Sequence, residues 1–235
     1  MNHEDKNIFR SLYSDDIGTV QLVESYGSDL TVVNAARVSF GASKTELDNK
    51  DKKLIKYLID HRHTSTLEHC GVTFKFVVPL FVRSQHMRHR TWSYNEISRR
   101  YTDKDLAFYM PETFRTQHPS NRQASNLDSS HNPSIIHGTD YKDASTLVAN
   151  HVSESVKLFE SLMASGVARE QARMVLPQNL YTEYYGTVNL SNLIKFISLR
   201  THEGAQWEIQ QVANACLDIA KGLWPHTMTA LANES

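Results

Sequence analysis

The chain has 235 residues, of which 40% are hydrophobic and 22% are charged, and its formal net charge is -1. This length and composition suffice for one domain with a substantial hydrophobic core, and we expect that domain to span residues 1–235. The near-neutral charge, with a pI of about 6.9, disfavours a dedicated nucleic-acid-binding protein, because such proteins usually carry excess positive charge over a whole face.

Cysteine usage and the N-terminal segment indicate a compartment. The two cysteines, Cys70 and Cys216, are too few for a disulfide framework, which favours a reducing environment. The segment Met1–Asn7 lacks the apolar core of a signal peptide, and no apolar run approaches transmembrane length. We therefore expect a cytoplasmic protein with no membrane partner.

The first half of the chain predicts alternating strands and helices. Residues 19–26 are typical of a strand, and Asp29 is expected to cap the helix that follows. An apolar stripe at helical spacing predicts a second helix over 46–61. Residues 72–78 alternate in polarity like a half-buried strand, and Pro79 is expected to begin a third helix. On one face of that helix would lie Phe81, Gln85 and Arg88.

The second half is helical apart from one polar region and one strand. Residues 111–141 are rich in Ser, Asn, His and Gln and show no apolar period, so we expect a long surface loop there. Apolar stripes predict helices over 144–165, 189–199 and 205–223. The Tyr, Thr and Val content of residues 182–189 favours a strand.

The segment Arg88–Tyr101 concentrates positive charge. It holds four arginines and one histidine against a single carboxylate, Glu96. Clustered guanidinium groups repel one another unless an anion lies among them, and arginine binds phosphate through two charge-assisted hydrogen bonds. The pattern therefore indicates phosphate recognition. Two alternatives stay open on charge alone: a solvated charged face, and a nucleic-acid patch in which Trp92, Tyr94 and Tyr101 stack on bases.

A second polar cluster runs from His61 to Cys70 and contains three histidines and a cysteine. Imidazole and thiolate are common zinc ligands, but the spacing fits no zinc signature, so we predict no metal site. Farther along, Arg173 and Arg200 have structural interpretations of their own. Arg173 alone is typical of a surface charge, and Arg200 at a helix C-terminus complements the helix dipole.

The basic segment also carries a family resemblance. The pattern Arg88-His89-Arg90-x-x-Ser93-x-Asn95-x-x-Ser98-x-Arg100 is similar in every fixed position to the signature of the flavin-dependent thymidylate synthases. Further resemblances are found in the segments 35–39, 61–69, 172–177 and 205–209, so the similarity runs from about Asn34 to Gln211.

The resemblance implies a fold and an activity. The expected fold is α+β (mixed α/β), a single domain with a mainly antiparallel sheet flanked by long helices. The expected reaction is the methylation of dUMP to dTMP, with FAD as cofactor and with NADPH and methylenetetrahydrofolate as cosubstrates. A homotetramer with shared active sites is implied as well, and no nucleic-acid partner. The alternative is a relative that modifies another pyrimidine nucleotide, such as dCMP or a hydroxymethyl variant.

The resemblance also implies site residues. Arg200 is the expected catalytic residue. The dUMP contacts are expected at Gln85, His86, Met87, Arg88, Glu96, Ile97, Ser98, Arg99, Arg100, Arg173 and Arg200. The FAD contacts are expected at Ser39, His63, Ser65, Arg88, His89, Arg90, Asn95, Glu96, Asn189, Ser191 and Lys195.

Three positions depart from the family pattern. Ser191 stands where the family commonly has arginine, Lys195 where it has asparagine or histidine, and Gly204 where a histidine is frequent. The loss of an arginine near a phosphate should weaken flavin binding by about 1.5–3 kcal/mol, unless Lys195 substitutes for it.

The resemblance implies that an arginine, rather than a thiolate, activates the pyrimidine. Thiolate attack needs an activated cysteine, whereas Cys70 precedes an apolar strand and Cys216 belongs to a core stripe. Electrostatic stabilisation by Arg200 is the expected alternative. No base is fixed beside Ser98 by spacing, so we assign Ser98 to binding rather than to nucleophilic attack.

Overall fold

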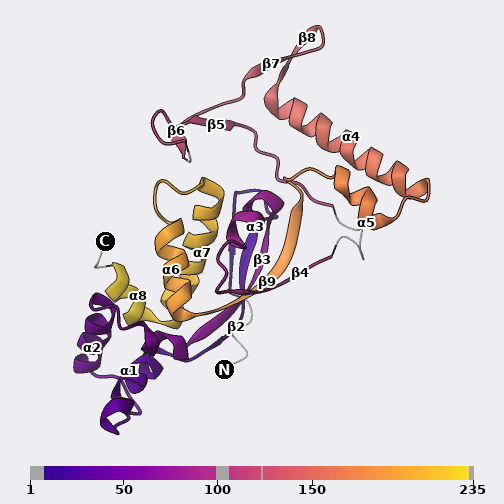
Figure 1. Cartoon of the computed structure of the whole chain (residues 1–235). Coiled ribbons are helices and arrows are strands. Elements are labelled where there is room, and N and C mark those ends of the chain that lie inside the picture. Colours follow the sequence, from indigo (N-terminus) through magenta and orange to yellow (C-terminus); the bar gives the residue numbers. More distant parts are fainter. Residues whose placement is uncertain (1–7, 99–105, 123, 233–235) are drawn as a thin grey trace.

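A five-stranded antiparallel sheet organises the molecule. The computed structural model describes residues 8–98, 106–122 and 124–232. Within these ranges the strand order of the sheet is β1-β2-β3-β9-β4, and every neighbouring pair is antiparallel (Figure 1). The strands are β1 (Phe9–Ser11), β2 (Thr19–Tyr26), β3 (Gly71–Pro79), β9 (Tyr181–Asn189) and β4 (Ser93–Glu96). The strands predicted over 19–26, 72–78 and 182–189 are confirmed, and so is the mainly antiparallel α+β fold.

Helices complete the core on this sheet. Val72, Phe74, Phe76 and Val78 of β3 are buried and share one hydrophobic cluster with the apolar stripe of α7. Each such side chain stabilises the fold by roughly 1.5–3 kcal/mol. The helices of this part are α1 (Asp29–Arg37), α2 (Asn49–Asp60), α3 (Leu80–His86), α6 (Leu190–Arg200), α7 (Trp207–Leu223) and α8 (Pro225–Ala232), with short 3-10 helices η2 (Val38–Phe40) and η3 (Thr64–His69).

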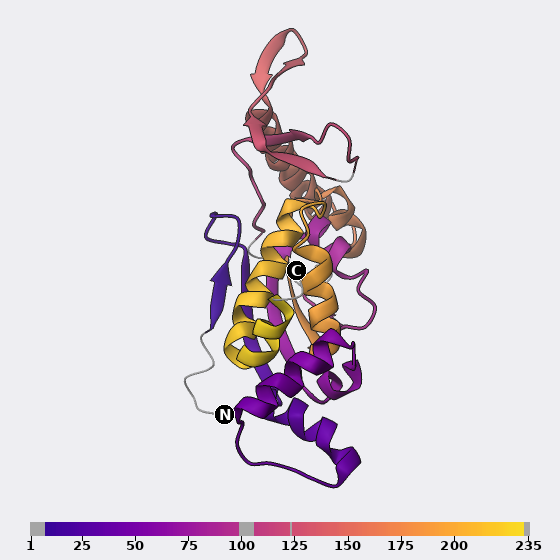
Figure 2. The same ribbon diagram turned by 90° about the vertical axis from the view of Figure 1, so that its left-hand side faces the viewer.

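The polar region after Pro111 forms two hairpins instead of the expected loop. β5 (Phe114–Gln117) pairs with β6 (Ser125–His131), and β7 (Ser134–His137) pairs with β8 (Asp140–Asp143). We call residues 114–143 the arm, because they extend away from the five-stranded sheet in both views (Figures 1 and 2). The prediction of a surface position is confirmed, since every residue of β7 and β8 is exposed. The prediction of a loop is wrong.

A second, smaller core lies at the base of the arm. α4 (Ala144–Ala164) packs Phe159 against Ala172, Leu176 and Leu180, which belong to or follow α5 (Arg169–Ala172) and η4 (Arg173–Val175). The 144–165 helix is thereby confirmed. This packing holds Arg173 close to the start of β9, where the candidate site is built.

Two local predictions need correction. The N-cap of α1 is Ser28, whereas the Asp29 carboxylate accepts hydrogen bonds from the backbone of His226 (2.8 Å) and Thr227 (3.0 Å) and so caps α8. α3 ends at His86, so Arg88 lies in the following turn and not on the helical face with Gln85. Neither α8 nor the edge strands β1 and β4 were predicted.

Candidate functional site

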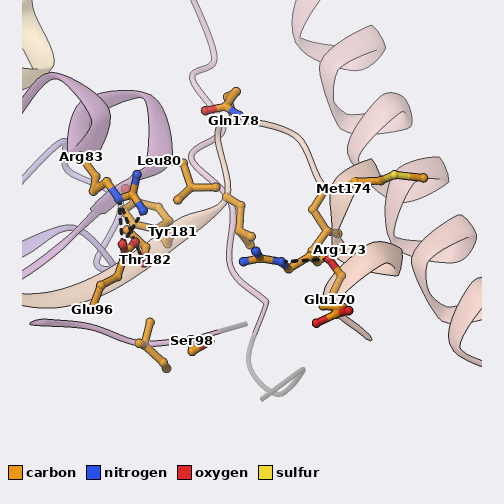
Figure 3. A pocket seen from close by; sticks show the side chains of 13 residues that line it. Leu80, Arg83, Glu96, Ser98, Glu170, Arg173, Met174, Gln178, Tyr181 and Thr182 are labelled. Carbon is orange, nitrogen blue, oxygen red and sulfur yellow. Dashed lines mark hydrogen bonds and ion pairs between the residues drawn. The ribbon is translucent and has the colours of Figure 1, made fainter. Parts of the chain in front are cut away.

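A cavity of about 550 Å³ opens between the start of α3, the end of β4, the α5–η4 segment and the start of β9 (Figure 3). Four residues expected to bind the nucleotide line it, namely Glu96, Ile97, Ser98 and Arg173. Two more, Arg99 and Arg100, lie outside the described residues. The structure therefore brings together residues that are more than seventy positions apart in sequence.

The Glu96 carboxylate is held from two sides inside this cavity. Arg83 donates to both carboxylate oxygens, with Nε at 3.0 Å from Oε1 and 2.9 Å from Oε2, and a second guanidinium nitrogen pairs with Oε2. Thr182 Oγ1 donates to Oε1 at 2.7 Å. Sequence reasoning missed Arg83 and Thr182, because no local spacing links either residue to Glu96. The only signal was that Glu96, as a carboxylate in a polar strand, would need a partner.

The opposite wall carries Arg173. Its Nε donates to the backbone carbonyl of Glu170 at 3.3 Å, and its guanidinium group extends toward the cavity (Figure 3). No carboxylate forms an ion pair with Arg173 within the part of the chain that the structure describes. Arg173 is thus a cation whose charge no side chain neutralises there, which suits the binding of an anion.

His86, a further expected nucleotide contact, does not line this cavity and is fully buried. Its Nδ1 lies 2.8 Å from the hydroxyl of Tyr184, and its ring packs against Phe76, Trp92 and Phe196. Burial lowers the pKa of His86 to about 3, so the ring is neutral at physiological pH. Because 0% of the residue is exposed, the His86 side chain faces the core and not the open cavity. His86 supports the site from inside the core.

The turn after α3 joins this buried cluster to Arg200. Arg200 Nε donates to Nε2 of His89 at 3.0 Å, which requires that Nε2 carry no proton. Partial burial, and then the neighbouring Arg200 charge, lower the pKa of His89 to about 4. The hydroxyl of Tyr94 donates to the carbonyls of His86 (3.0 Å) and His89 (3.2 Å), which fixes the turn. Arg200 therefore has a defined orientation.

Arg200 keeps an uncompensated charge in this arrangement. Burial first, and then the nearby charge of Arg88, lower the pKa of Arg200 from its ordinary value. Both causes disfavour the charged form, so an anion placed beside Arg200 would relieve them. Among the described residues, no carboxylate lies within ion-pair distance of Arg200. Such a group can stabilise negative charge that develops on a substrate.

The residues expected to contact the nucleotide on α3 and in the turn that follows it differ in their exposure to solvent. Gln85 is partly buried, and its Oε1 is a buried acceptor with no partner among the described atoms. Met87 is partly buried against the core, while Arg88 and Arg90 are exposed. The structure thus presents two exposed cations and an unsatisfied amide on one short stretch of chain.

The residues expected to bind FAD occupy two surfaces of the chain. Arg88, His89, Arg90, Asn95 and Glu96 belong to the turn after α3 and to β4. The other group lies on η2, on η3 and the residue before it, at the end of β9 and on α6, and its members are Ser39, His63, Ser65, Asn189, Ser191 and Lys195. Ser39, His63, Ser65 and Lys195 are exposed and accessible to a ligand.

Two residues of the second group, Asn189 and Ser191, lie at the start of α6. Asn189 caps α6, because its Oδ1 accepts from the backbone of Asn192 at 2.9 Å. Ser191 is only 2% exposed, and its buried hydroxyl has no partner in the described ranges. Ser191 nevertheless lines a cavity of about 530 Å³ between α2, η3 and α6, together with Thr64 and Lys195. Lys195 is the cation of α6 nearest to Ser191 in sequence. It is exposed, and its Nζ lies 3.4 Å from Asn192 Oδ1.

Neither cysteine has the properties of a nucleophile. Cys70 and Cys216 are both 0% exposed. Burial raises the pKa of Cys70 to about 11, and burial also raises the pKa of Cys216 well above its ordinary value. Because the thiolate is the reactive form, both thiols are inert at neutral pH. The predicted core position of Cys216 is confirmed.

The two described aromatic residues of the basic segment, Trp92 and Tyr94, pack against the core instead of forming a stacking surface for bases. Trp92 is 6% exposed, and Tyr94 packs against it with a ring-centroid distance of 6.2 Å. Tyr101 lies outside the described residues. The two described rings serve the core, which argues against the nucleic-acid interpretation.

The described part of the chain contains neither a cluster of metal ligands nor a membrane-spanning helix. No group of three or more histidine, cysteine, aspartate or glutamate side chains gathers there in a way that could hold a metal ion. No helix in those ranges is both long and apolar enough to span a membrane.

Comparisons with known proteins give a consistent result. The family described as thymidylate synthase complementing protein matches residues 21–226. A flavin-dependent thymidylate synthase of Thermus thermophilus is 46% identical over 211 residues, which cover 88% of this chain and 72% of that protein. The enzyme of the same name from Thermosipho melanesiensis is 39% identical over 215 residues, with 90% and 89% covered.

A solved structure is similar over nearly the whole chain. The crystal structure of the UMP/dUMP methylase PolB from Streptomyces cacaoi, bound with 5-Br dUMP, aligns with a TM-score of 0.77 at 34% identity. The alignment covers 95% of this chain and 97% of that one.

Proposed function

The chain belongs to the thymidylate synthase complementing protein family, whose members include flavin-dependent thymidylate synthases, and we propose that it methylates dUMP at C5 to give dTMP. One observation carries the proposal. Four of the residues that the family resemblance assigns to the nucleotide line one cavity, namely Glu96, Ile97, Ser98 and Arg173. The similarity to a UMP/dUMP methylase supports the same substrate class.

The charges around the cavity suit a nucleoside monophosphate. Arg173 has no neutralising side chain in the described ranges and would bind the phosphate. Glu96 can only accept hydrogen bonds while it is ionised, so it would face the nucleoside part and not the phosphate. The nucleotide would thereby enter in one orientation.

The exposed residues that the family resemblance assigns to FAD also suit the binding of a flavin dinucleotide. A diphosphate needs exposed cations, and Arg88, Arg90 and Lys195 supply them, while His63 and Ser65 add exposed hydrogen-bonding groups. Together with Ser39, His89, Asn95 and Asn189, these residues would hold FAD. When bound, the reduced flavin would supply the hydride that completes the methyl group.

Arg200 would act on the pyrimidine. The charge of Arg200 is oriented by His89 and is not neutralised by a carboxylate in the described ranges, so it would stabilise negative charge on the uracil ring as C5 becomes nucleophilic. The two buried cysteines offer no thiolate for attack at C6. Activation by charge is therefore the route that the side chains of this protein support.

Exposed apolar residues support a homotetramer with shared sites. Phe40 is 87% exposed beside Ser39, Met174 is 77% exposed beside Arg173, and Leu199 is 57% exposed beside Arg200. Large apolar side chains at such positions commonly mark contacts between subunits. We propose that copies of the chain meet there and join the two flavin surfaces. A monomer with bound FAD in light scattering would contradict this arrangement.

The finer features of the reaction are proposals on the same basis. We propose NADPH as the reductant, methylenetetrahydrofolate as the carbon donor and the cytoplasm as the compartment. The assay is tritium release from C5-labelled dUMP with FAD, NADPH and methylenetetrahydrofolate present, and then with each omitted in turn. Release that needs all three is the expected result.

A second candidate substrate is UMP, because the similar PolB structure is that of a UMP/dUMP methylase. Labelled UMP and dCMP in the same assay would separate the possibilities. Release from UMP or dCMP, but not from dUMP, would mean that the scaffold is right and the proposed substrate wrong.

A further inference from the structure

Arg83 is a charged residue of the cavity to which neither the sequence nor the family resemblance assigns a role. It belongs to α3, two residues before Gln85, and its side chain remains 30% exposed. In Figure 3 its guanidinium group lies directly over the Glu96 carboxylate. Arg83 and Glu96 are 13 residues apart in sequence, so the fold and not a local turn makes the pair.

The pair constrains Glu96 more than a single hydrogen bond would. Two guanidinium nitrogens of Arg83 donate to the carboxylate, and Thr182 donates to Oε1 from β9. The backbone is fixed as well, because Glu96 is paired in register with Tyr184, and Ile97 N donates to the Glu183 carbonyl at 2.9 Å. A bidentate arginine–carboxylate pair fixes the carboxylate plane. Glu96 therefore presents its remaining acceptor positions in one direction.

A carboxylate fixed in this way selects what can bind. It accepts hydrogen bonds, and the donors of a uridine nucleotide are its sugar hydroxyl groups and the N3–H of its base. The Glu96 side chain keeps 19% exposure, which leaves part of its surface to a ligand. Arg173 lines the opposite wall, where it would bind phosphate.

We propose that Arg83 is a positioning and specificity-determining residue, which holds Glu96 as the acceptor for a hydrogen-bond donor on the nucleoside part of the substrate. The inference rests on the proposed binding of a uridine nucleotide in this cavity. It assigns Arg83 a role through Glu96 and no direct contact with the substrate.

The test is a double-mutant cycle on the full-length, flavin-loaded protein. The variants are Arg83→Met, Arg83→Lys, Glu96→Gln and the double variant Arg83→Met/Glu96→Gln. Steady-state KM and kcat would be measured with dUMP and with UMP, and dUMP affinity would be measured separately by calorimetry. Arg10→Met is the matched control, because Arg10 also pairs with a carboxylate, Asp218, in an exposed ion pair.

The expected result separates binding from turnover. Arg83→Met should raise the KM and the calorimetric Kd for dUMP by about tenfold, while kcat changes by less than about threefold. Arg83→Lys keeps the charge but loses the bidentate geometry, so its KM should lie between those of the wild type and Arg83→Met. In the Glu96→Gln background, Arg83→Met should have no further effect. Arg10→Met should leave KM unchanged.

Two outcomes would overturn the proposal. Additive effects of Arg83→Met and Glu96→Gln would mean that Arg83 contacts the nucleotide itself. If folded Arg83→Lys and Arg83→Met variants both bind dUMP with the wild-type affinity, the Arg83–Glu96 ion pair has only a structural role. Failure of the proposed function is recognised separately, since it would show as no tritium release by the wild type, while calorimetry would still report on Arg83.

Discussion

Two arginines are joined through the same buried cluster, and their charges are treated in opposite ways. Arg83 is neutralised by Glu96, whereas Arg200 donates to the neutral His89 and meets no carboxylate in the described ranges. Between them lie Tyr184 and His86, which are hydrogen-bonded to each other in the core. A compensated charge thus orients a neighbouring group, whereas an uncompensated charge is available to an anion.

The uncompensated charge affects the pKa values of Arg200 and of its neighbour His89. The pKa of Arg200 is lowered by burial and by Arg88, and that of His89 falls to about 4 by burial and by Arg200. A protonated histidine beside Arg200 would add a second cation, so a neutral His89 is the partner that the pair tolerates. Preorganised charge of this kind is often the largest electrostatic contribution to catalysis.

Replacing Arg200 should have the largest effect. Arg200→Ala should lower kcat for tritium release by about 10³-fold, because the charge that stabilises the activated pyrimidine is removed. Flavin absorbance and the melting temperature of the variant serve as controls for cofactor binding and folding. A folded, flavin-loaded variant that kept kcat within tenfold of the wild type would contradict the catalytic role.

Replacing Arg173 should instead weaken binding. Arg173→Gln keeps a side chain of similar polarity but removes the unpaired charge from the cavity. We expect KM for dUMP to rise by about tenfold or more, since charge-assisted hydrogen bonds contribute about 1.5–3 kcal/mol. The rise should shrink as salt is added, because screening weakens the wild-type attraction for phosphate. A lower kcat at unchanged KM would contradict the binding role and would give Arg173 a catalytic role instead.

The buried cluster between the two arginines should be sensitive to acid. Burial depresses the pKa of His86 to about 3, below the ordinary value of 6.5 that the unfolded chain has. Between these pH values the unfolded state binds more protons, so the free energy of unfolding should fall as the pH is lowered from about 6.5 toward about 3. The contribution should be roughly several kcal/mol for so deeply buried a group.

Urea unfolding as a function of pH measures this loss. His86→Phe, which keeps an aromatic ring but removes the titrating group, should show a smaller loss over the same interval. His151→Gln is the control, because His151 is exposed on α4 and its replacement should leave the slope unchanged. An identical slope in the wild type and in His86→Phe would assign the acid sensitivity to other groups.

The smallest effect is expected at the cysteines. Cys70→Ala and Cys216→Ala should keep kcat within about threefold, because neither buried thiol forms a thiolate at neutral pH. Each variant should lose about 1 kcal/mol of stability or more through the small cavity it creates. A folded variant of either cysteine with no tritium release would restore thiolate attack as the route.

Much of the fold could be predicted from local pattern. The alternation of β3 and the stripes of α4, α6 and α7 gave correct elements, because one face of each is buried. The arm escaped prediction for the converse reason. β7 and β8 are exposed on both faces, so their sequence carries no alternation. The helix α8 was missed since its cap is Asp29, a residue 197 positions earlier than the first amide it receives.

The candidate site, like the fold, could be predicted from the sequence only in part. Residue type, spacing and family resemblance were enough to select the signature from Arg88 onward, Arg173, Arg200 and the two inert cysteines. Accessibility and pairing, by contrast, depend on the folded chain. His86 and Ser191 are buried, Arg83 pairs with Glu96, and Arg200 donates to His89. The reason is physical: burial and ion pairing depend on neighbours brought by distant strands and helices, which no local spacing encodes.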